Sequence, residues 1–516
     1  MGCDVGTQSA KALLVDDEGI VVSRAVRAYP TRHPAPGWAE QDPDDWIAAV
    51  FAAVHEVVSA AGVDPRSVRA LGIDGQVDGV VAVDRANRAL APAPIWMDRR
   101  ASAELTAAER SLDRETIRAI TGANPDPSHG GPKLAWLRGH LPDRPDAYLP
   151  PASYVVARLT GERVVDAANA SSLLLFDLVR GAWSGRLLEA FGAEERQLPA
   201  IRPATGVAGS LDPRVASELG LSPECAVIVG TGDEHAAAVA ANLLEPGLVC
   251  DVMGTAEPVA AAALEPVVDP LELVETHAHA VPGRWLVEHP GFISAGTVRW
   301  LAEDVLGCDR AEIAALAADA PAGAAGVAFV PALGGASTPR WNPSVLAAFT
   351  GLTIGHDRRH LARAVVEGCA LAVRAIVERL SVMGLAGDTI RVVGGAAREA
   401  ALLQLRADVT RRRVERLEEP EASALGAALL AAVGVGVFPN VETAVRAALR
   451  IDRVVYEPDP RLGPVYDELW FRHRRTFDAL ESLVEPAPGS LPLSTVAGGP
   501  AEPVPSAPPS AFGGVR

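Results

Sequence analysis

The chain has 516 residues, of which 49% are hydrophobic and 22% charged, so it can bury a large core but is too long for a single one. Its 47 basic and 65 acidic side chains give a formal charge of −18, which argues against nucleic acid or an anionic membrane as a partner. The five cysteines lie far apart with no C-x-x-C pair, which favours neither a disulfide framework nor a zinc site and fits a reducing cytoplasm.

The first thirty residues predict three strands separated by turns. The strands are expected at residues 3–5, 11–15 and 20–28, with Asp17-Glu18-Gly19 as the turn between the last two. Because only Met1 precedes Gly2-Cys3-Asp4, we expect a first strand of about two residues, where roughly 5–6 is typical. We therefore expect the natural start to lie upstream of Met1, with residues that would lengthen this strand.

A helix follows, and strands then alternate with helices to the end of the chain. Asp42-Pro43-Asp44 marks the helix start, with proline and acidic residues in the first turn, and Gly62 ends it. The apolar side chains that share one face at helical spacing are Trp46, Val50, Ala53 and Val57. Short strands are predicted at residues 68–73 and 80–83, and the continuing alternation indicates the α/β class.

Two stretches near the C-terminus bear on the boundaries of the fold. The uncharged run at residues 422–438 is mostly Ala, Gly and Val, which is too weakly apolar for a membrane span and predicts a buried helix followed by a turn. Residues 465–484 predict the last packed helix. Residues 485–516 are rich in Pro and Gly, a composition that predicts a disordered tail.

Two short strings place a glycine and a threonine at the end of a strand. Asp4-Val5-Gly6-Thr7 and Asp251-Val252-Met253-Gly254-Thr255 each precede another apolar strand, which predicts a duplicated β-hairpin. Glycine lets backbone N–H groups approach a phosphate and threonine adds a donor, so two such turns could grip one phosphate chain from both sides. Asp4 could hold Mg²⁺ through water. For either string alone, an ordinary glycine turn is the alternative interpretation.

Two further strings suggest a reacting group and a surface for a flat ring. A buried strand ends in Gly230-Thr231-Gly232, with Asp233 at the mouth of an Ala-rich helix. Asp233 is either the N-cap of that helix or a general base that takes a proton from a hydroxyl attacking a γ-phosphate. The strand ending in Val393-Gly394-Gly395 could lie against adenine, and the small residues of 422–428 would allow close packing behind it. Tight helix–sheet packing explains the small residues equally well.

Together and in this order, the strings resemble the FGGY family of carbohydrate kinases, and within it the xylulokinases most closely. The resemblance extends over nearly the whole chain, from Gly2 to Val484. The additional motifs that carry it are Pro36-Gly37-Trp38-Ala39-Glu40-Gln41, Gly75-Gln76-x-x-Gly79, Trp96-x-Asp98-x-Arg100, Pro132-Lys133-Leu134, Thr338-Pro339-Arg340-Trp341 and Glu367-Gly368.

The resemblance implies two actin-like (ribonuclease H-like) α/β domains with a ligand cleft between them. Residues 1–240 would bind the sugar and carry the base Asp233, and residues 241–484 would bind ATP. Asp4 and Asp233 would face Mg²⁺. The residues that match ATP-binding positions are Gly6, Thr7, Gln8, Lys11, Gly254, Thr255, Gly296, Gly394, Gly395 and Ala396. Those that fall in the sugar-binding region are Gln76, Val77, Asp78, Trp96, Asp98, Asp233 and Glu234.

The chain departs from the xylulokinase pattern around the expected ligands. Asp78 stands where a sugar-facing His is usual, and Glu234 stands where Asn follows the catalytic Asp. The other departures are Glu257 after Gly-Thr-Ala in place of Gly-Thr-Ser, Ala336-Ser337 in place of Glu-Arg, and Val393 in place of the first Gly of the adenosine loop. A carboxylate in place of a neutral donor changes which hydroxyl pattern is satisfied. The sequence therefore predicts phosphoryl transfer and leaves the sugar open.

The expected function is ATP-dependent phosphorylation of a ketopentose in the cytoplasm, first of all D-xylulose to D-xylulose 5-phosphate, with ATP and Mg²⁺ as cofactors. One alternative is a kinase for another ketose or polyol; a second is a catalytically silent actin-like sensor of sugar or nucleotide. Retention of Asp4, Thr7, Asp233 and Thr255 disfavours the sensor. The sequence does not fix the oligomeric state, and a homodimer is one option. His277-x-His279 has metal-ligand character, but its two side chains would share one strand face with no third ligand evident, so a metal site is not favoured.

Overall fold

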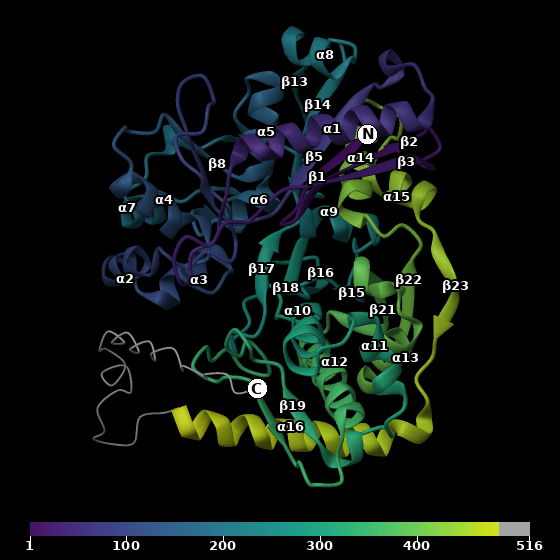
Figure 1. The fold of residues 1–516 in the computed structure, drawn as a ribbon. Helices are drawn as coiled ribbons and strands as arrows, with labels where there is room; N and C mark the ends of the chain where they lie inside the picture. Colours follow the sequence, from purple (N-terminus) through teal and green to yellow (C-terminus); the bar gives the residue numbers. More distant parts are fainter. Residues whose placement is uncertain (485–516) are drawn as a thin grey trace, which may run out of the picture.

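A computed structural model describes residues 1–484; the predicted tail at 485–516 lies outside them. The chain forms two sheets, one above the other in Figure 1, with helices packed on both. The upper sheet has the order β13-β14-β5-β1-β2-β3, formed by β1 (Gly2–Val5), β2 (Ser9–Val15), β3 (Val21–Ala28), β5 (Ala70–Gly75), β13 (Val207–Ser210) and β14 (Ala226–Gly232). The lower sheet has the order β17-β18-β16-β15-β21-β22-β23, formed by β15 (Gly247–Val252), β16 (Val259–Ala263), β17 (Glu275–Ala278), β18 (Trp285–His289), β21 (Ala386–Val393), β22 (Arg413–Leu417) and β23 (Ile451–Tyr456).

Helices divide between the same two halves. The N-terminal half, from β1 to α9, contains α1 (Pro43–Ala61), α2 (Ser102–Ser111), α3 (Arg114–Thr121), α4 (Gly130–His140), α5 (Pro151–Thr160), α6 (Ala167–Ser171), α7 (Gly185–Phe191), α8 (Pro213–Leu219) and α9 (Asp233–Ala240). The C-terminal half, from β15 to α16, contains α10 (Ala295–Trp300), α11 (Arg310–Ala318), α12 (Arg358–Val382), α13 (Ala400–Thr410), α14 (Ala422–Gly434), α15 (Val441–Ala448) and α16 (Gly463–Val484). Two-stranded pairs join β4 (Glu40–Gln41) to β7 (Ala93–Pro94) and β6 (Val81–Val83) to β8 (Ala147–Leu149).

The N-terminal strands are confirmed, with one correction of length. The prediction of about two residues for the first strand is wrong, because β1 has four. This length is closer to the roughly 5–6 residues that are typical of strands. Pairing on both sides explains the length: Asp4 lies opposite Lys11 of β2 in an antiparallel ladder and opposite Asp74 of β5 in a parallel one. The Met1 ammonium also donates to the Ala70 carbonyl at 2.9 Å. The expected upstream start stays a prediction.

The helix predicted after Asp42 is α1, and its ends follow the predicted signals. The Asp42 side chain accepts from the Asp44 N–H at 3.1 Å, and Gly62 takes the left-handed conformation with φ of 64°. The residues of the predicted apolar face, Trp46, Val50, Ala53 and Val57, are all at most 1% exposed. This face covers β2 and β3, so the predicted apolar face of α1 is the one that packs on the upper sheet.

The predicted duplication is confirmed in the strand pairing. In the upper sheet β1 pairs antiparallel with β2 and parallel with β5; in the lower sheet β15 pairs antiparallel with β16 and parallel with β21. The turns after β1 and β15, which carry Gly6-Thr7 and Gly254-Thr255, therefore occupy equivalent places in the two halves. The fold is two-domain, actin-like and mixed α/β, as expected.

Helices α9 and α14 connect the halves through very close backbone contacts. Helix α14 belongs to the C-terminal half but packs on β1, β5 and β14 of the upper sheet, beside α9. A Cβ on Gly426 would lie 1.9 Å from the Ala236 carbonyl oxygen of α9, and one on Gly72 would lie 2.1 Å from that of Ala427. Close packing therefore accounts for the small residues of 422–428. Within residues 1–484, no helix is long and apolar enough to cross a membrane.

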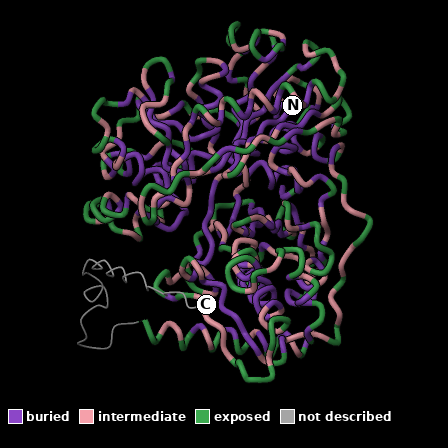
Figure 2. The backbone as a smooth tube through the Cα atoms, viewed as in Figure 1, coloured by how far each residue is buried: buried purple, intermediate pink, exposed green. Residues whose placement is uncertain are grey.

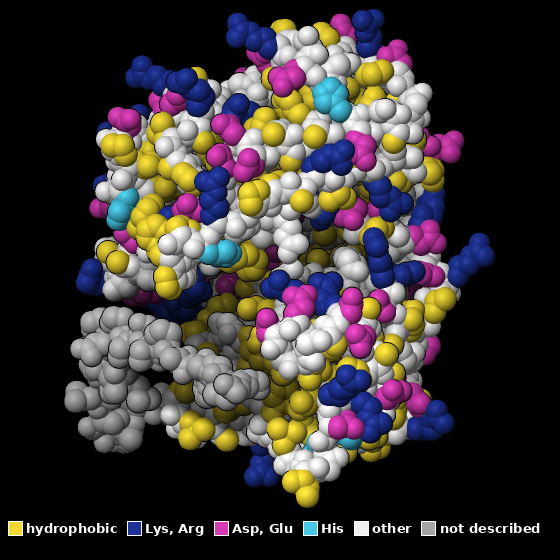
Figure 3. Space-filling model, viewed as in Figure 1, with side chains coloured by type: hydrophobic (Ala, Val, Ile, Leu, Met, Phe, Trp, Pro, Cys, Tyr) yellow, Lys and Arg dark blue, Asp and Glu magenta, His cyan; other side chains and the backbone are white. Residues whose placement is uncertain are grey.

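The surface of the molecule has a recess between its two halves. Buried residues concentrate in the sheets and under the helices that cover them (Figure 2). The space-filling view shows the surface hollowed between the upper and lower halves (Figure 3). A recess between two domains is where small-molecule sites commonly lie.

Candidate active site

The two Gly-Thr turns face each other across the halves. The Gln8 Nε2 donates to Thr255 Oγ1 at 3.4 Å, a contact that joins the turn after β1 to the turn after β15. The Gly6 N–H donates to the Ser9 carbonyl at 3.1 Å, which closes the first turn. Thr7 is half-buried, and Gln8 and Thr255 are exposed, so their polar groups remain accessible. This apposition fulfils the condition for holding one phosphate chain from both sides.

Three carboxylates cluster beside the first turn. Asp4 and Asp74 lie opposite each other on neighbouring strands, and Asp233 directly follows Gly232, which pairs with Gly75. Burial, with the negative charges of Asp4 and Asp233, raises the pKa of Asp74 well above its usual value. Burial and the charge of Asp4 likewise raise the pKa of Asp233 to about 7. The sequence analysis missed Asp74, although a carboxylate inside an apolar strand was a usable signal.

Asp233 is not the cap of α9, and only one of its carboxylate oxygens is engaged in a hydrogen bond among the described residues. The N-cap of α9 is Gly232, so the N-cap interpretation of Asp233 is wrong. One carboxylate oxygen, Oδ1, accepts from the Glu234 N–H at 3.0 Å, and the side chain is half-buried. Within the described chain no hydrogen bond engages Oδ2, which leaves it free to accept a proton.

Asp4 suits a magnesium ion bound together with nucleotide phosphates. Its Oδ2 accepts from Lys11 Nζ at 3.0 Å, and Lys11 also lies 3.3 Å from Glu421 Oε2. Its Oδ1 is buried and has no hydrogen-bond partner among the described residues. Because Mg²⁺ usually takes one or two carboxylates plus phosphates and waters, this donor set fits it. The described residues include no group of three or more metal-ligating side chains arranged to hold a metal by themselves.

The sugar-region residues lie next to the first turn. Trp96 Nε1 donates to Thr7 Oγ1 at 2.9 Å, which connects the two. Asp78 is half-buried, has a left-handed backbone with φ of 62°, and lies with its Oδ1 3.1 Å from His129 Nδ1. Such a conformation is rare for residues other than glycine and is frequent at functional sites. Val77 beside it is also half-buried, so both side chains have access to solvent.

Asp98 and Gln76, both expected to contact the sugar, are buried and bonded to neighbouring protein groups. Asp98 is fully buried, and its oxygens accept from the Ala39 N–H at 2.6 Å and from Arg100 Nε at 2.9 and 3.0 Å. Gln76 is 1% exposed, and its Nε2 donates to Gln41 Oε1 at 2.8 Å. The geometry therefore contradicts a direct sugar contact for Asp98, because its acceptors are already used. Gln76 keeps a free acceptor, since its Oε1 has no hydrogen-bond partner among the described residues, and its sugar contact stays a prediction.

Behind Glu234 lies a buried group of acids and imidazoles from β17 and β18. His277 Nε2 lies 3.5 Å from Glu275 Oε2 and 3.6 Å from Glu288 Oε1. Burial disfavours the charged form of His277, but Glu275 and Glu288 outweigh it and raise its pKa. Burial, followed by the charge of Glu288, raises the pKa of Glu234 well above its usual value. His279 is buried too, and its Nδ1 accepts from the Val281 N–H at 2.9 Å, which is a structural contact.

The expected adenosine loop lies against the second turn. The Met253 N–H donates to the Val393 carbonyl at 2.9 Å, and the Ala396 N–H donates to the Met253 carbonyl at 3.2 Å. Gly394 has φ of 97°, and a Cβ there would lie 2.8 Å from the Met253 oxygen, so this position requires glycine. The Gly296 N–H lies 3.4 Å from the Thr255 carbonyl. The structure therefore brings together the expected nucleotide residues of the C-terminal half, including Gly395.

A buried ion triad that the sequence analysis missed supports the second turn. Arg406 of α13 is 3% exposed; its Nη1 lies 3.3 Å from Asp251 Oδ2, and its Nη2 donates to Glu257 Oε1. Asp251 and Glu257 flank Gly254-Thr255, and both are fully buried. Glu257, one of the departures from the xylulokinase pattern, is therefore paired with Arg406, which lies 149 residues further along the chain.

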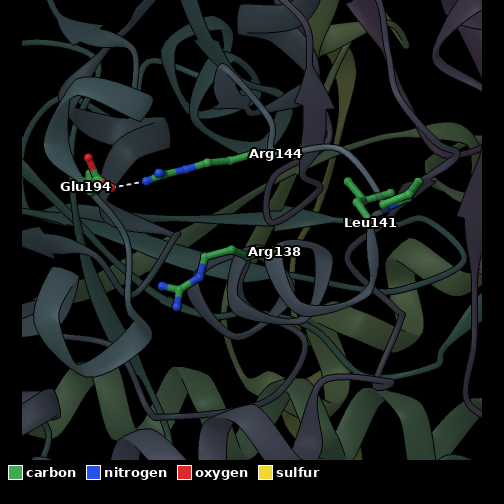
Figure 4. A pocket seen from close by; sticks show the side chains of 5 residues that line it. Arg138, Leu141, Arg144 and Glu194 are labelled. Carbon is green, nitrogen blue, oxygen red and sulfur yellow. Dashed lines mark hydrogen bonds and ion pairs between the residues drawn. The ribbon is translucent and has the colours of Figure 1, made fainter.

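A separate surface depression lies elsewhere on the N-terminal half. It has a volume of about 490 Å³, and Arg138, Leu141, Pro142, Arg144 and Glu194 line it. Arg144 and Glu194 form an ion pair across it (Figure 4). None of the residues described above lines this depression, so it is not part of the candidate site.

The chain matches two domains of one protein family. Residues 1–240 match the "FGGY family of carbohydrate kinases, N-terminal domain", and residues 250–435 match the C-terminal domain of the same family. The glycerol kinase of Thermococcus onnurineus is 30% identical over 478 residues, which cover 91% of this chain and 94% of that protein. The xylulose kinase of Escherichia coli is 31% identical over 437 residues, covering 84% and 89%.

The structural comparison agrees with the sequence comparison. The crystal structure of xylulose kinase from Rhodospirillum rubrum superimposes with a TM-score of 0.83 at 30% identity, covering 93% of this chain and 99% of that one. Plasmodium falciparum glycerol kinase with ADP gives a TM-score of 0.82 at 22% identity, which bears on the fold alone. Xylulose kinases and glycerol kinases are therefore similar to this chain to nearly the same degree.

Proposed function

Because this chain belongs to the FGGY family of carbohydrate kinases, we propose that it transfers the γ-phosphate of ATP to a terminal hydroxyl of a ketopentose, with D-xylulose the leading acceptor. The observation that carries the proposal is the apposition of the two Gly-Thr turns beside Asp233. In this proposal the N-terminal half, residues 1–240, binds the sugar and supplies the base, and residues 241–484 bind ATP.

Each residue then has a chemical role. Mg²⁺ bound with ATP would neutralise phosphate charge, and Asp4 is the carboxylate placed to hold it. The hydroxyls of Thr7 and Thr255 and the N–H groups of their turns donate to phosphate oxygens. Asp233 Oδ2 accepts the proton of the acceptor hydroxyl as that oxygen attacks phosphorus, and Oδ1 stays bonded to the Glu234 N–H.

A polyol such as glycerol is the second candidate acceptor. One observation favours it: the glycerol kinase relatives match as well as the xylulose kinases. Asp78 and Glu234, which place two additional carboxyl groups near Asp233, suit either kind of acceptor. Carboxylates accept hydrogen bonds from hydroxyls, which every neutral polyol and ketose offers. The charge of Asp78 repels an anionic acceptor such as a sugar acid, whereas the raised pKa of Glu234 favours its neutral form.

The acceptor preference is tested by kcat/KM over D-xylulose, glycerol, other ketoses and polyols, and D-gluconate in a coupled assay of ADP release. We expect D-xylulose to exceed the best other neutral acceptor by less than about 100-fold, equivalent to about 2.7 kcal/mol. We expect D-gluconate to fall below the best neutral acceptor by at least about 100-fold, because the like charge of Asp78 would lie beside its carboxylate.

Three outcomes would contradict parts of this proposal. A preference for D-xylulose beyond that limit would show that Asp78 and Glu234 lie outside the discriminating contacts. Efficient use of D-gluconate would show that the Asp78 carboxylate is neutralised in the complex. Nucleotide binding without turnover of any acceptor would replace the kinase by the sensor alternative.

A further inference from the structure

The chain has two lysines, Lys11 of the site described above and Lys133, and the contacts of Lys133 all reach towards that site. It lies in the first turn of α4 and is 0% exposed. Its Nζ donates to the carbonyl oxygens of Asp78 at 2.9 Å, of Ile95 at 2.7 Å, and of Ser128. An ammonium group has three N–H donors, so all of its hydrogen-bonding capacity is used on backbone carbonyls.

Two of these carbonyls belong to segments that carry a sugar-region side chain, and the third belongs to a segment that contacts one of these side chains. Asp78 is itself such a residue, Ile95 directly precedes Trp96, and Ser128 directly precedes His129, which contacts Asp78 at 3.1 Å. The three segments are far apart in sequence and have no strand ladder in common. Lys133 is therefore one point at which the segments carrying Asp78 and Trp96 are tied together, in addition to the Val80 N–H, which donates to the Pro94 carbonyl at 3.2 Å.

The energetics favour a protonated and rigidly held Lys133. Burying an ammonium is costly unless its donors are satisfied, and here three acceptors satisfy them. Burial lowers the pKa of Lys133 to about 8, against the attraction of Asp78, Asp98 and Asp126. The left-handed backbone of Asp78 also needs surrounding contacts to persist, and the carbonyl of that residue is one of the three acceptors.

We propose that Lys133 is the positioning residue of the acceptor site: it fixes the relative placement of Asp78 and Trp96, and thereby acceptor affinity, without contacting the acceptor or ATP. This inference rests on the proposed function, since it assigns the organisation of the same acceptor site. Most nucleotide residues, among them Thr255 and Gly394, belong to the other half, and only Thr7 contacts Trp96, so ATP binding should depend on Lys133 much less than acceptor binding does.

The test compares Lys133→Met with Gln197→Met. Gln197 is a matched control, because it is 2% exposed in the same half and its Nε2 also donates to a backbone carbonyl, that of Pro145 at 3.0 Å. Lys133→Met keeps an unbranched side chain that is one heavy atom shorter, and it removes the donors. We expect kcat/KM for the best acceptor to fall at least about 30-fold, mainly through KM, since buried carbonyls lose their partners. The Kd for ATP, measured by calorimetry, should stay within about twofold of wild type.

A second variant guards against misfolding of the first. Lys133→Gln retains two N–H donors, so its kcat/KM for the acceptor should lie between wild type and Lys133→Met. If Lys133→Met does not fold, a soluble Lys133→Gln with wild-type acceptor KM overturns the proposal, and a raised KM with unchanged ATP Kd supports it.

The remaining outcomes separate this inference from the proposed function. Equal loss of kcat/KM in Lys133→Met and Gln197→Met would mean that Lys133 is only structural, and so would a parallel loss of ATP affinity. A wild-type protein that turns over no acceptor overturns the proposed function and this inference with it. A wild-type protein active on an acceptor, with Lys133→Met equal to it, overturns this inference alone.

Discussion

Replacing Asp233 with Asn should lower kcat by about 1,000-fold while leaving the Kd for ATP near wild type, because general base catalysis contributes about 10²–10⁴. The amide keeps the shape of the side chain, and its oxygen can still accept from the Glu234 N–H as Oδ1 does now. What is lost is the proton acceptor. The measurements are ADP release at saturating acceptor and ATP, and calorimetry for ATP binding.

Asp166→Asn provides the matched control for Asp233→Asn. Asp166 is a buried carboxylate that accepts from Thr231 Oγ1 at 2.7 Å and caps α6, and asparagine caps helices equally well. The control should keep most of its activity. Retention of a tenth or more of wild-type kcat by Asp233→Asn would limit its contribution to about 1.4 kcal/mol, too little for the base.

Replacing Gly426 with Ala should lower the free energy of unfolding by about 3 kcal/mol, the upper end for overpacking a core. The added methyl would lie 1.9 Å from the Ala236 carbonyl oxygen, and the obstacle is backbone, which cannot rotate away as a side chain does. Helix α14 would have to move off α9. Calorimetric unfolding and urea denaturation, both with and without ATP, measure the loss.

Gly139→Ala is the matched control for Gly426→Ala. Gly139 also lies in a helix, α4, but nothing lies within 4 Å of the position of an added Cβ. Because alanine favours the helix over glycine by about 1 kcal/mol, this control should be neutral or stabilising. Equal effects of the two substitutions would show that α9 and α14 separate without cost.

The parts of the fold that the sequence predicted well are those that local pattern determines. Helix α1 has its cap, its proline and its apolar face within twenty residues, and the two Gly-Thr turns are marked by the strands on either side. Asp233 was recognisable because a strand ends in glycine directly before it. The alternative interpretation of Asp233 as a cap was wrong because the backbone places Gly232 at that position.

The parts that escaped prediction depend on partners far along the chain. His129 contacts Asp78 across 51 residues, and Arg406 contacts Glu257 across 149. Periodicity carries no information on such pairs, since it reports only which face of one element is apolar. The same limit explains Asp98: its motif suggested a sugar contact, whereas burial against Arg100 and the Ala39 N–H makes it a support.

The crossing of α9 and α14 has a mechanical consequence for catalysis. Helix α9 begins with Asp233, and Glu421, the residue before α14, lies 3.3 Å from Lys11, which in turn holds Asp4. If one half rotates against the other about this crossing, the axis of rotation therefore lies beside Asp4 and Asp233. Atoms near a rotation axis move least. Thr255, whose hydrogen bond to the N-terminal half comes from Gln8, would move further. We therefore expect the two halves to separate for nucleotide exchange while Asp4 and Asp233 keep their relative placement.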